Sequence, residues 1–168
     1  MDKGKLSIDG NNPRMFLASK MFQNQQKTIK QLCKTFRSPV KSLELRRGEK
    51  IGDKTKKANV PQKLGIYLIY GKNKRNAKLL YIGKGGSVNQ NGEPTRQGLR
   101  GRIKNTRNKN MSGQNYFKKL MQNYDYLQVC WIQTFTENKK TIPAKAEAEL
   151  LQIYFDERQQ LPPENKRA

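Results

Sequence analysis

Histidine is absent from all 168 residues, and this absence removes a large part of hydrolytic chemistry. Enzyme classes that use an imidazole as general base or as metal ligand are excluded. Any hydrolysis must therefore take its base from tyrosine, lysine or a carboxylate. A metal ion would have to be bound by oxygen ligands, which favours Mg²⁺ or Mn²⁺ over zinc.

Cysteine and long apolar runs are also scarce. The two cysteines, Cys33 and Cys130, lie far apart and form no CxxC pair. This spacing excludes a cysteine zinc site and argues against a disulfide framework. No run of about 18 apolar residues occurs, and the first residues lack the apolar stretch of a signal peptide. We therefore expect a cytoplasmic protein with no membrane segment.

Acidic residues are few compared with basic ones. Thirteen Asp and Glu stand against 35 Lys and Arg, which leaves a net charge of +22. Residues 1–60 carry fifteen basic and five acidic residues, and residues 61–168 carry twenty and eight, so both parts are strongly basic. A field of this sign attracts nucleic acids and other polyanions. Composition predicts nucleic-acid binding, but it does not bear on cleavage.

The sequence divides into a basic N-terminal arm, residues 1–62, and a domain over residues 63–168. Within the arm an amphipathic helix is predicted by apolar residues at helical spacing, until Ser38-Pro39 ends the pattern. These apolar residues are Phe22, Ile29, Leu32, Cys33 and Phe36. The helix either packs on the core or acts as a DNA-contacting arm. Residues 44–63 are expected to be a polar, basic linker.

The domain is expected to belong to the α/β (α+β) class, with a three-stranded sheet flanked by helices. Short runs rich in β-branched and aromatic residues, 65–70 and 79–82, predict an antiparallel hairpin across a turn-rich stretch. The other elements expected, in chain order, are a loop over 85–94, a helix carrying Leu99 and Ile103, a helix starting at Ser112, a strand over 126–135 buried on both faces, and a helix from Pro143 to about Arg158.

Glu147 stands out on the last predicted helix. Three, four and seven residues beyond it are Leu150, Leu151 and Tyr154, so its carboxylate lies on the apolar stripe that faces the core. Glu149 is on a more polar side of the same helix. A core-facing carboxylate is either neutralised by a structural Lys or Arg or holds a metal ion.

Two short strings carry a resemblance. Gly65-Ile66-Tyr67 opens the first strand of the hairpin, and Tyr81-Ile82-Gly83-Lys84 ends the second. With a helical arginine in Leu99-Arg100-Gly101-Arg102-Ile103 and the later Glu147, the order resembles the GIY-YIG endonuclease family over about residues 63–166. The resemblance implies a GIY-YIG-type domain that hydrolyses phosphodiester bonds of DNA with Mg²⁺ or Mn²⁺.

The resemblance also implies roles for single residues. Glu147 would bind the metal, and Arg102 the scissile phosphate, with Arg100 as a possible substitute. Tyr67 is the preferred general base, Tyr81 its partner, and Lys84 a neighbour that favours phenolate. Asn165 sits where many members have an asparagine after the final helix, so it is included among the DNA-binding residues with Arg100. Lys104 and Arg107 are not assigned by the resemblance and fit solvated contacts with the DNA backbone.

Position 106 departs from the family pattern. Many members have His or Tyr four residues after the arginine, and this chain has Thr106, which cannot act as a base.

Other interpretations stay open. Asp125 with Glu137-Asn138-Lys139 has the look of a different nuclease metal site, although the Glu137 segment is expected to be a polar loop. A non-catalytic nucleic-acid-binding module would keep the same fold without turnover. Among enzymes, a restriction-type nuclease competes with a structure-selective or weakly specific repair or mobile-element nuclease, and a homodimer is compatible with each.

Overall fold

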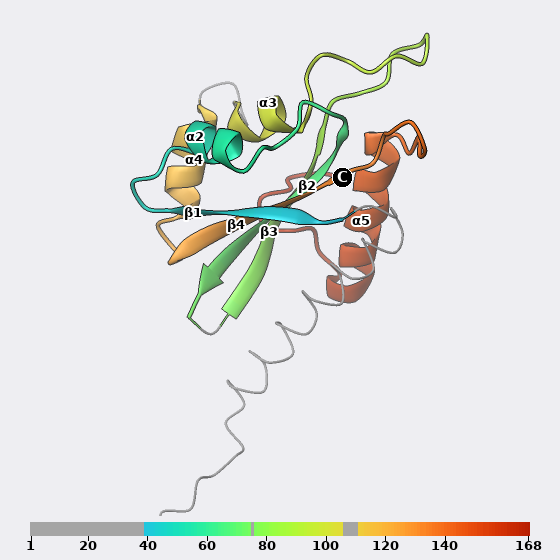
Figure 1. Cartoon of the computed structure of the whole chain (residues 1–168). Coiled ribbons are helices and arrows are strands. Elements are labelled where there is room, and N and C mark those ends of the chain that lie inside the picture. The colour runs from blue at the N-terminus through green and yellow to red at the C-terminus, as the bar shows by residue number, and fades with distance from the viewer. Residues whose placement is uncertain (1–38, 75, 106–110) are drawn as a thin grey trace, which may run out of the picture.

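A computed structural model describes residues 39–74, 76–105 and 111–168 (Figure 1). The predicted amphipathic helix, Cys33, Thr106 and Arg107 lie outside these ranges. The elements are β1 (Lys41–Arg46), α2 (Ile51–Lys57), β2 (Gly65–Asn73), β3 (Asn76–Gly85), α3 (Leu99–Lys104), α4 (Gly113–Leu120), β4 (Tyr126–Gln133) and α5 (Pro143–Arg158).

The strands form one antiparallel sheet with the order β1-β4-β2-β3. The predicted hairpin is confirmed as β2 and β3, which pair with Tyr67 opposite Gly83. β4 lies between β1 and β2 and is buried on both faces, as predicted from its apolar residues on both alternations. The prediction of three strands is wrong, because β1 is a fourth strand.

The predicted linker over residues 44–63 is also wrong. β1 pairs with β4 over its whole length, and α2 follows it. Leu43 and Leu45 point into the core, while the other residues of β1 are exposed. Two apolar residues among charged ones are a weak strand signal, which explains the error. The boundary expected at residue 62 therefore falls inside one packed unit.

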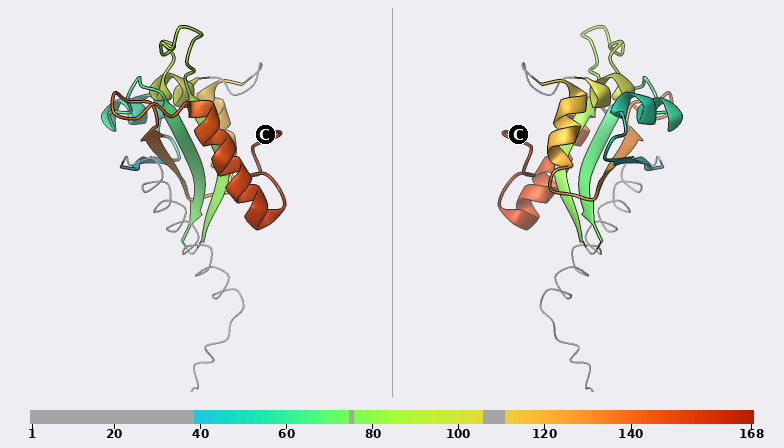
Figure 2. Two further views of the ribbon diagram at one scale, coloured as in Figure 1. Left: turned by 90° about the vertical axis from the view of Figure 1, so that its right-hand side faces the viewer. Right: turned by 90° about the vertical axis from the view of Figure 1, so that its left-hand side faces the viewer.

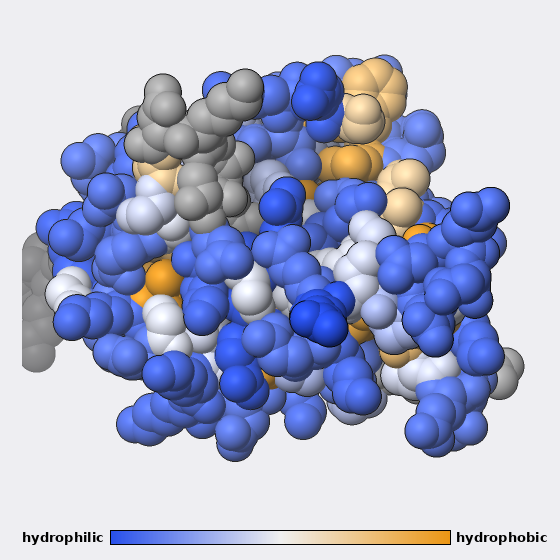
Figure 3. Space-filling model, turned by 90° about the horizontal axis from the view of Figure 1, so that it is seen from above, coloured by the Kyte–Doolittle hydropathy of each residue, from blue (hydrophilic) through white to orange (hydrophobic). Residues whose placement is uncertain are grey.

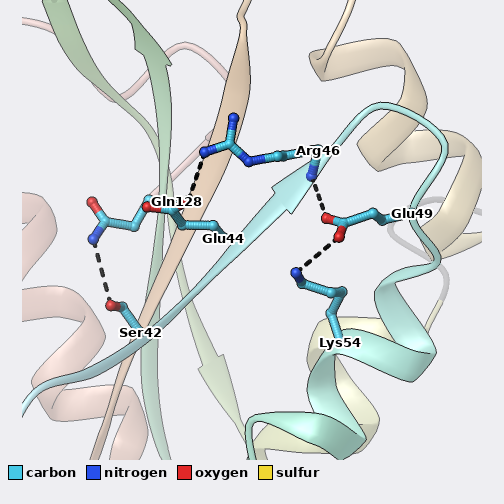
Figure 4. A network of polar contacts seen from close by, with 6 residues as sticks. All are labelled: Ser42, Glu44, Arg46, Glu49, Lys54 and Gln128. Atoms are coloured by element: carbon cyan, nitrogen blue, oxygen red, sulfur yellow. Dashed lines mark hydrogen bonds and ion pairs between the residues drawn. The ribbon is translucent and has the colours of Figure 1, made fainter.

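A polar network holds β1 and α2 together on the surface (Figure 4). Glu49 accepts hydrogen bonds from the backbone N–H of Arg46 at 2.7 Å and from Lys54 Nζ at 3.0 Å. Glu44 pairs with the Arg46 guanidinium at 3.0 Å. On β4, Gln128 donates to the Ser42 hydroxyl at 3.4 Å. Burial of Leu43 and Leu45 anchors the strand, and the network fixes its surface.

Helices cover both faces of the sheet (Figure 2). α2, α3 and α4 pack on one face, where Tyr67, Leu99, Phe117 and Trp131 belong to the larger apolar cluster. α5 is the one helix of the described ranges that packs on the other face, where Leu150 and Leu151 belong to a smaller cluster with residues of β2, β3 and β4. The α+β class is thus confirmed.

Helix boundaries follow the sequence signals. Ser112 caps α4 by accepting a hydrogen bond from the Asn115 N–H, as its place before the apolar stripe predicts. Pro143 occupies the first turn of α5, and Gln159 ends that helix in the left-handed conformation.

Within the ranges that the structure describes, no helix is long and apolar enough to cross a membrane.

Candidate active site

The hairpin brings the two predicted tyrosines together. Tyr67 of β2 and Tyr81 of β3 lie with their ring centroids 5.8 Å apart. Tyr67 is fully buried, whereas Tyr81 is partly exposed. The two phenols are therefore neighbours, but only Tyr81 reaches a surface from which a ligand could approach in this conformation.

Gly83 makes room for both rings. A Cβ atom at this position would collide with Cε1 of Tyr81 and would lie 2.8 Å from the Tyr67 hydroxyl oxygen. Any side chain here would have to displace one of the two phenols. The glycine of the Tyr-Ile-Gly string thus has a steric role, which the string alone does not reveal.

Glu147 lies beside the hairpin, on α5. Its carboxylate is half-buried and accepts a hydrogen bond from the backbone N–H of Lys84. The charges of Lys84 and Arg102 both act on it. The structure therefore brings Tyr81, Lys84 and Arg102 to the same carboxylate, with Tyr67 behind Tyr81. These side chains come from β2, β3, α3 and α5.

Two acidic groups of this set, Glu147 and Tyr81, have raised pKa values. Burial raises the pKa of the Glu147 carboxyl, although the positive charges of Lys84 and Arg102 and the Lys84 N–H oppose the shift. Burial also raises the pKa of Tyr81, the Glu147 charge adds to this, and Arg102 opposes it. Lys84 and Arg102 thus compensate the buried carboxylate incompletely.

A cleft of about 440 Å³ opens at the β3 edge of the sheet, and of this group Tyr81 and Glu147 line it. α4 contributes Tyr116 and Lys119, and α5 contributes Glu147 and Leu151. The remaining lining residues are Tyr81, Met111, Glu164, Asn165, Lys166, Arg167 and Ala168.

The donor set fits a hard divalent cation bound largely by substrate and water. Glu147 is one half-buried carboxylate whose two cationic neighbours do not fully offset its burial. Mg²⁺ is commonly bound by one or two carboxylates together with phosphate oxygens and waters. Among the described residues no cluster of three or more acidic or cysteine side chains offers a full cage. The residues present are therefore compatible with Mg²⁺ or Mn²⁺, for which Glu147 could supply one carboxylate ligand.

The other predicted DNA-contacting residues of α3 do not join this group. Arg100 donates from Nε to the backbone carbonyl of Val60 at 2.6 Å, so it ties α3 to the segment before β2. It is therefore a poor substitute for Arg102. Lys104 is exposed and lines a separate surface hollow with Lys50 and Lys118.

The side chain of Asn165 is hydrogen-bonded to the backbone of β3. Its amide donates to the Ile82 carbonyl at 2.8 Å and its Oδ1 accepts from the Ile82 N–H at 2.9 Å. The Glu164 N–H donates to the Leu80 carbonyl at 2.9 Å. These three bonds fasten the segment after α5 to the outer edge of β3. Asn165 lines the cleft while it holds this segment in place.

The alternative metal site is not assembled. Asp125 precedes β4 and accepts a hydrogen bond from the Lys74 N–H at 3.1 Å, whereas Glu137 is exposed beyond the far end of β4. The two carboxylates are separated by the length of an eight-residue strand, about 26 Å. They cannot share one ion.

Sequence reasoning did not single out three cations at the cleft, Lys119, Lys166 and Arg167. No spacing rule connects residues of α4 with residues beyond α5, so the sequence held no signal for them.

Comparison of the chain with protein-family models, with curated proteins and with solved structures finds no match.

Proposed function

We propose that this protein is a metal-dependent DNA endonuclease that hydrolyses phosphodiester bonds. The observation that carries the proposal is the convergence of Tyr81, Lys84 and Arg102 on the half-buried carboxylate of Glu147, at a cleft open to solvent. Phosphoryl transfer needs a cation site, a permanent positive charge for the phosphate, and a group to take or orient the proton of water. Glu147 and Tyr81 at the cleft, together with Arg102 and Lys84 beside Glu147, offer all three.

Arg102 is the proposed phosphate ligand. A guanidinium keeps its charge at all working pH values and presents a planar fork to phosphate oxygens. Lys84 adds a second positive charge beside Glu147. Together the two cations would offset the negative charge that develops on the phosphate.

Tyr81 is the proposed partner of the attacking water, because it lines the cleft and Tyr67 is fully buried. This assignment reverses the order expected from the sequence, in which Tyr67 was the preferred base. Tyr67 then acts as a positioning residue, since its ring packs 5.8 Å from that of Tyr81.

Glu147 would hold Mg²⁺ or Mn²⁺. When bound, the ion supplies Lewis-acid polarisation of the phosphate. The protein residues orient the substrate around it: Arg102 and Lys84 bind phosphate oxygens, and the Tyr81 hydroxyl faces the water.

The strong positive charge supports DNA as substrate but also suits a binding module without turnover. A restriction-type enzyme is the biological role we favour among nucleases. Its cleavage specificity would reside in the loop over residues 85–98, between β3 and α3, or in the arm.

Metal removal tests the proposal. We expect purified full-length protein to nick supercoiled plasmid in Mg²⁺ or Mn²⁺ and to be inactive in excess EDTA, with activity restored by added metal. Gel electrophoresis of the nicked and linear products measures this. DNA binding without any nicking across divalent ions would favour the binding module instead.

A further inference from the structure

Three cations line the cleft, in addition to Lys84 and Arg102, which act on Glu147 but are not among the residues that line it. Lys119 comes from α4, on one face of the sheet, and Lys166 and Arg167 come from the segment that follows α5. All three are exposed, and no ion pair in the described part of the chain involves any of them. Their charges are therefore open to a ligand.

The segment that carries Lys166 and Arg167 is held in a defined place. The paired hydrogen bonds of Asn165 with Ile82, and that of Glu164 with Leu80, fix it along the outer edge of β3. Tyr81 lies between these two anchored residues of β3. The two cations are thus positioned next to Tyr81 by the backbone of the same strand that carries it.

The size of the cleft bears on which ligand can enter it. About 440 Å³ lies between α4, the β3 edge and α5, with the Tyr116 and Tyr81 side chains in its wall. A space of this volume is large enough to hold part of one nucleic-acid strand. Two carboxylates also line it: Glu147 already faces Lys84 and Arg102, and Glu164 lies near Tyr124.

We propose that this cleft binds one strand of the DNA next to the scissile phosphate, with Lys119 on one side and Lys166 and Arg167 on the other contacting the flanking phosphates. The inference rests on the proposed function, because it takes the scissile phosphate to lie at Arg102 and Glu147. It adds three specific contacts, and it makes the segment after α5 part of the DNA-binding surface.

A triple variant, Lys119→Gln, Lys166→Gln and Arg167→Gln, tests the proposal in the full-length protein. The matched control is Lys74→Gln, Lys78→Gln and Lys140→Gln, which removes the same charge from exposed positions that do not line the cleft. Fluorescence anisotropy with a labelled DNA duplex in EDTA, at several salt concentrations, measures binding without cleavage. Thermal melting checks that both variants fold.

We expect the cleft variant to bind about 10-fold to 10²-fold more weakly at low salt and to lose about 2 to 3 from the slope of log K against log salt. The control should keep a slope close to that of the unaltered protein. Equal slopes for the two variants would overturn the inference while leaving plasmid cleavage, and with it the proposed function, intact. Absence of any DNA binding by the unaltered protein would overturn both.

Discussion

Two glutamates in this molecule sit beside lysines and have opposite pKa shifts. Glu49, on the surface between β1 and α2, has a lowered pKa, because the Arg46 N–H and then Lys54 Nζ donate hydrogen bonds to its ionised form. Glu147, in the cleft, has a raised pKa, because burial outweighs the Lys84 and Arg102 charges. The hydrogen bonds to Glu49 stabilise its ionised carboxylate and the local structure. The charges beside Glu147 do not fully offset the free-energy cost of burying its carboxylate.

A carboxylate whose burial is not fully offset by neighbouring positive charges is common at functional sites. The Glu49 carboxylate already accepts hydrogen bonds from its neighbours. A bound cation would instead offset the free-energy cost of burying the Glu147 carboxylate. The top face of the molecule, seen in Figure 3, is largely hydrophilic, so charged side chains are common there and do not by themselves mark a site. The environment of Glu147 therefore distinguishes it better than its charge does.

The largest expected effect comes from removing this carboxylate. Glu147→Gln should lower plasmid cleavage by at least about 10³-fold, because metal polarisation of the phosphate contributes several kcal/mol. DNA binding measured by anisotropy in EDTA should change little. Glu149→Gln is the matched control on the same helix, since Glu149 is exposed and pairs with Lys145 at 3.8 Å. Inactive Glu149→Gln with active Glu147→Gln would contradict the assignment.

The hairpin and Glu147 could be predicted because their signals are local. Strand residues on both sides of a turn-rich stretch specify β2 and β3, and the spacing to Leu150 and Leu151 specifies the face of α5. β1 could not, because its pairing with β4 joins Leu43 to Val129 across most of the chain. Non-local pairing leaves little trace in a short polar segment.

The proposed site residues were chosen from the sequence in two ways: Glu147 by its place on the core-facing side of its helix, and Tyr67, Tyr81, Lys84 and Arg102 by their resemblance to a family. That they form an active site stays a prediction. Their difference in exposure depends on tertiary packing: Trp131 and Phe117 share the cluster that buries Tyr67, and both lie far from it in sequence. The same holds for Arg100, whose hydrogen bond to Val60 is set by how α3 docks.

The next expected effect concerns the two tyrosines, which differ in exposure as the two glutamates differ in compensation. Tyr81→Phe should reduce cleavage by about 10² or more if its hydroxyl takes or orients the proton of the attacking water. Tyr67→Phe should reduce it less, because the buried ring still supports Tyr81. Single-turnover cleavage rates, with melting temperatures as a check on folding, measure the difference. A larger loss in Tyr67→Phe would return the base to Tyr67 and imply that the buried hydroxyl becomes accessible on DNA binding.

The smallest expected effect concerns Glu49, whose lowered pKa makes a prediction about pH. A carboxyl with a folded-state pKa below its ordinary value of 4.5 stabilises the fold above that value, and the contribution is lost as the pH falls through the folded-state pKa. Glu49→Gln should therefore reduce the free energy of unfolding at pH 7 by less than about 1 kcal/mol, since the group is partly exposed and screened. The two proteins should become equally stable once the pH is low enough to lie below the folded-state pKa of Glu49. Urea unfolding at pH 7 and at a series of acidic pH values measures this, and a difference that does not shrink as the pH falls would mean that Glu49 acts through packing and not through its charge. Cleavage should be unchanged in this variant, which separates the surface glutamate from the one in the cleft.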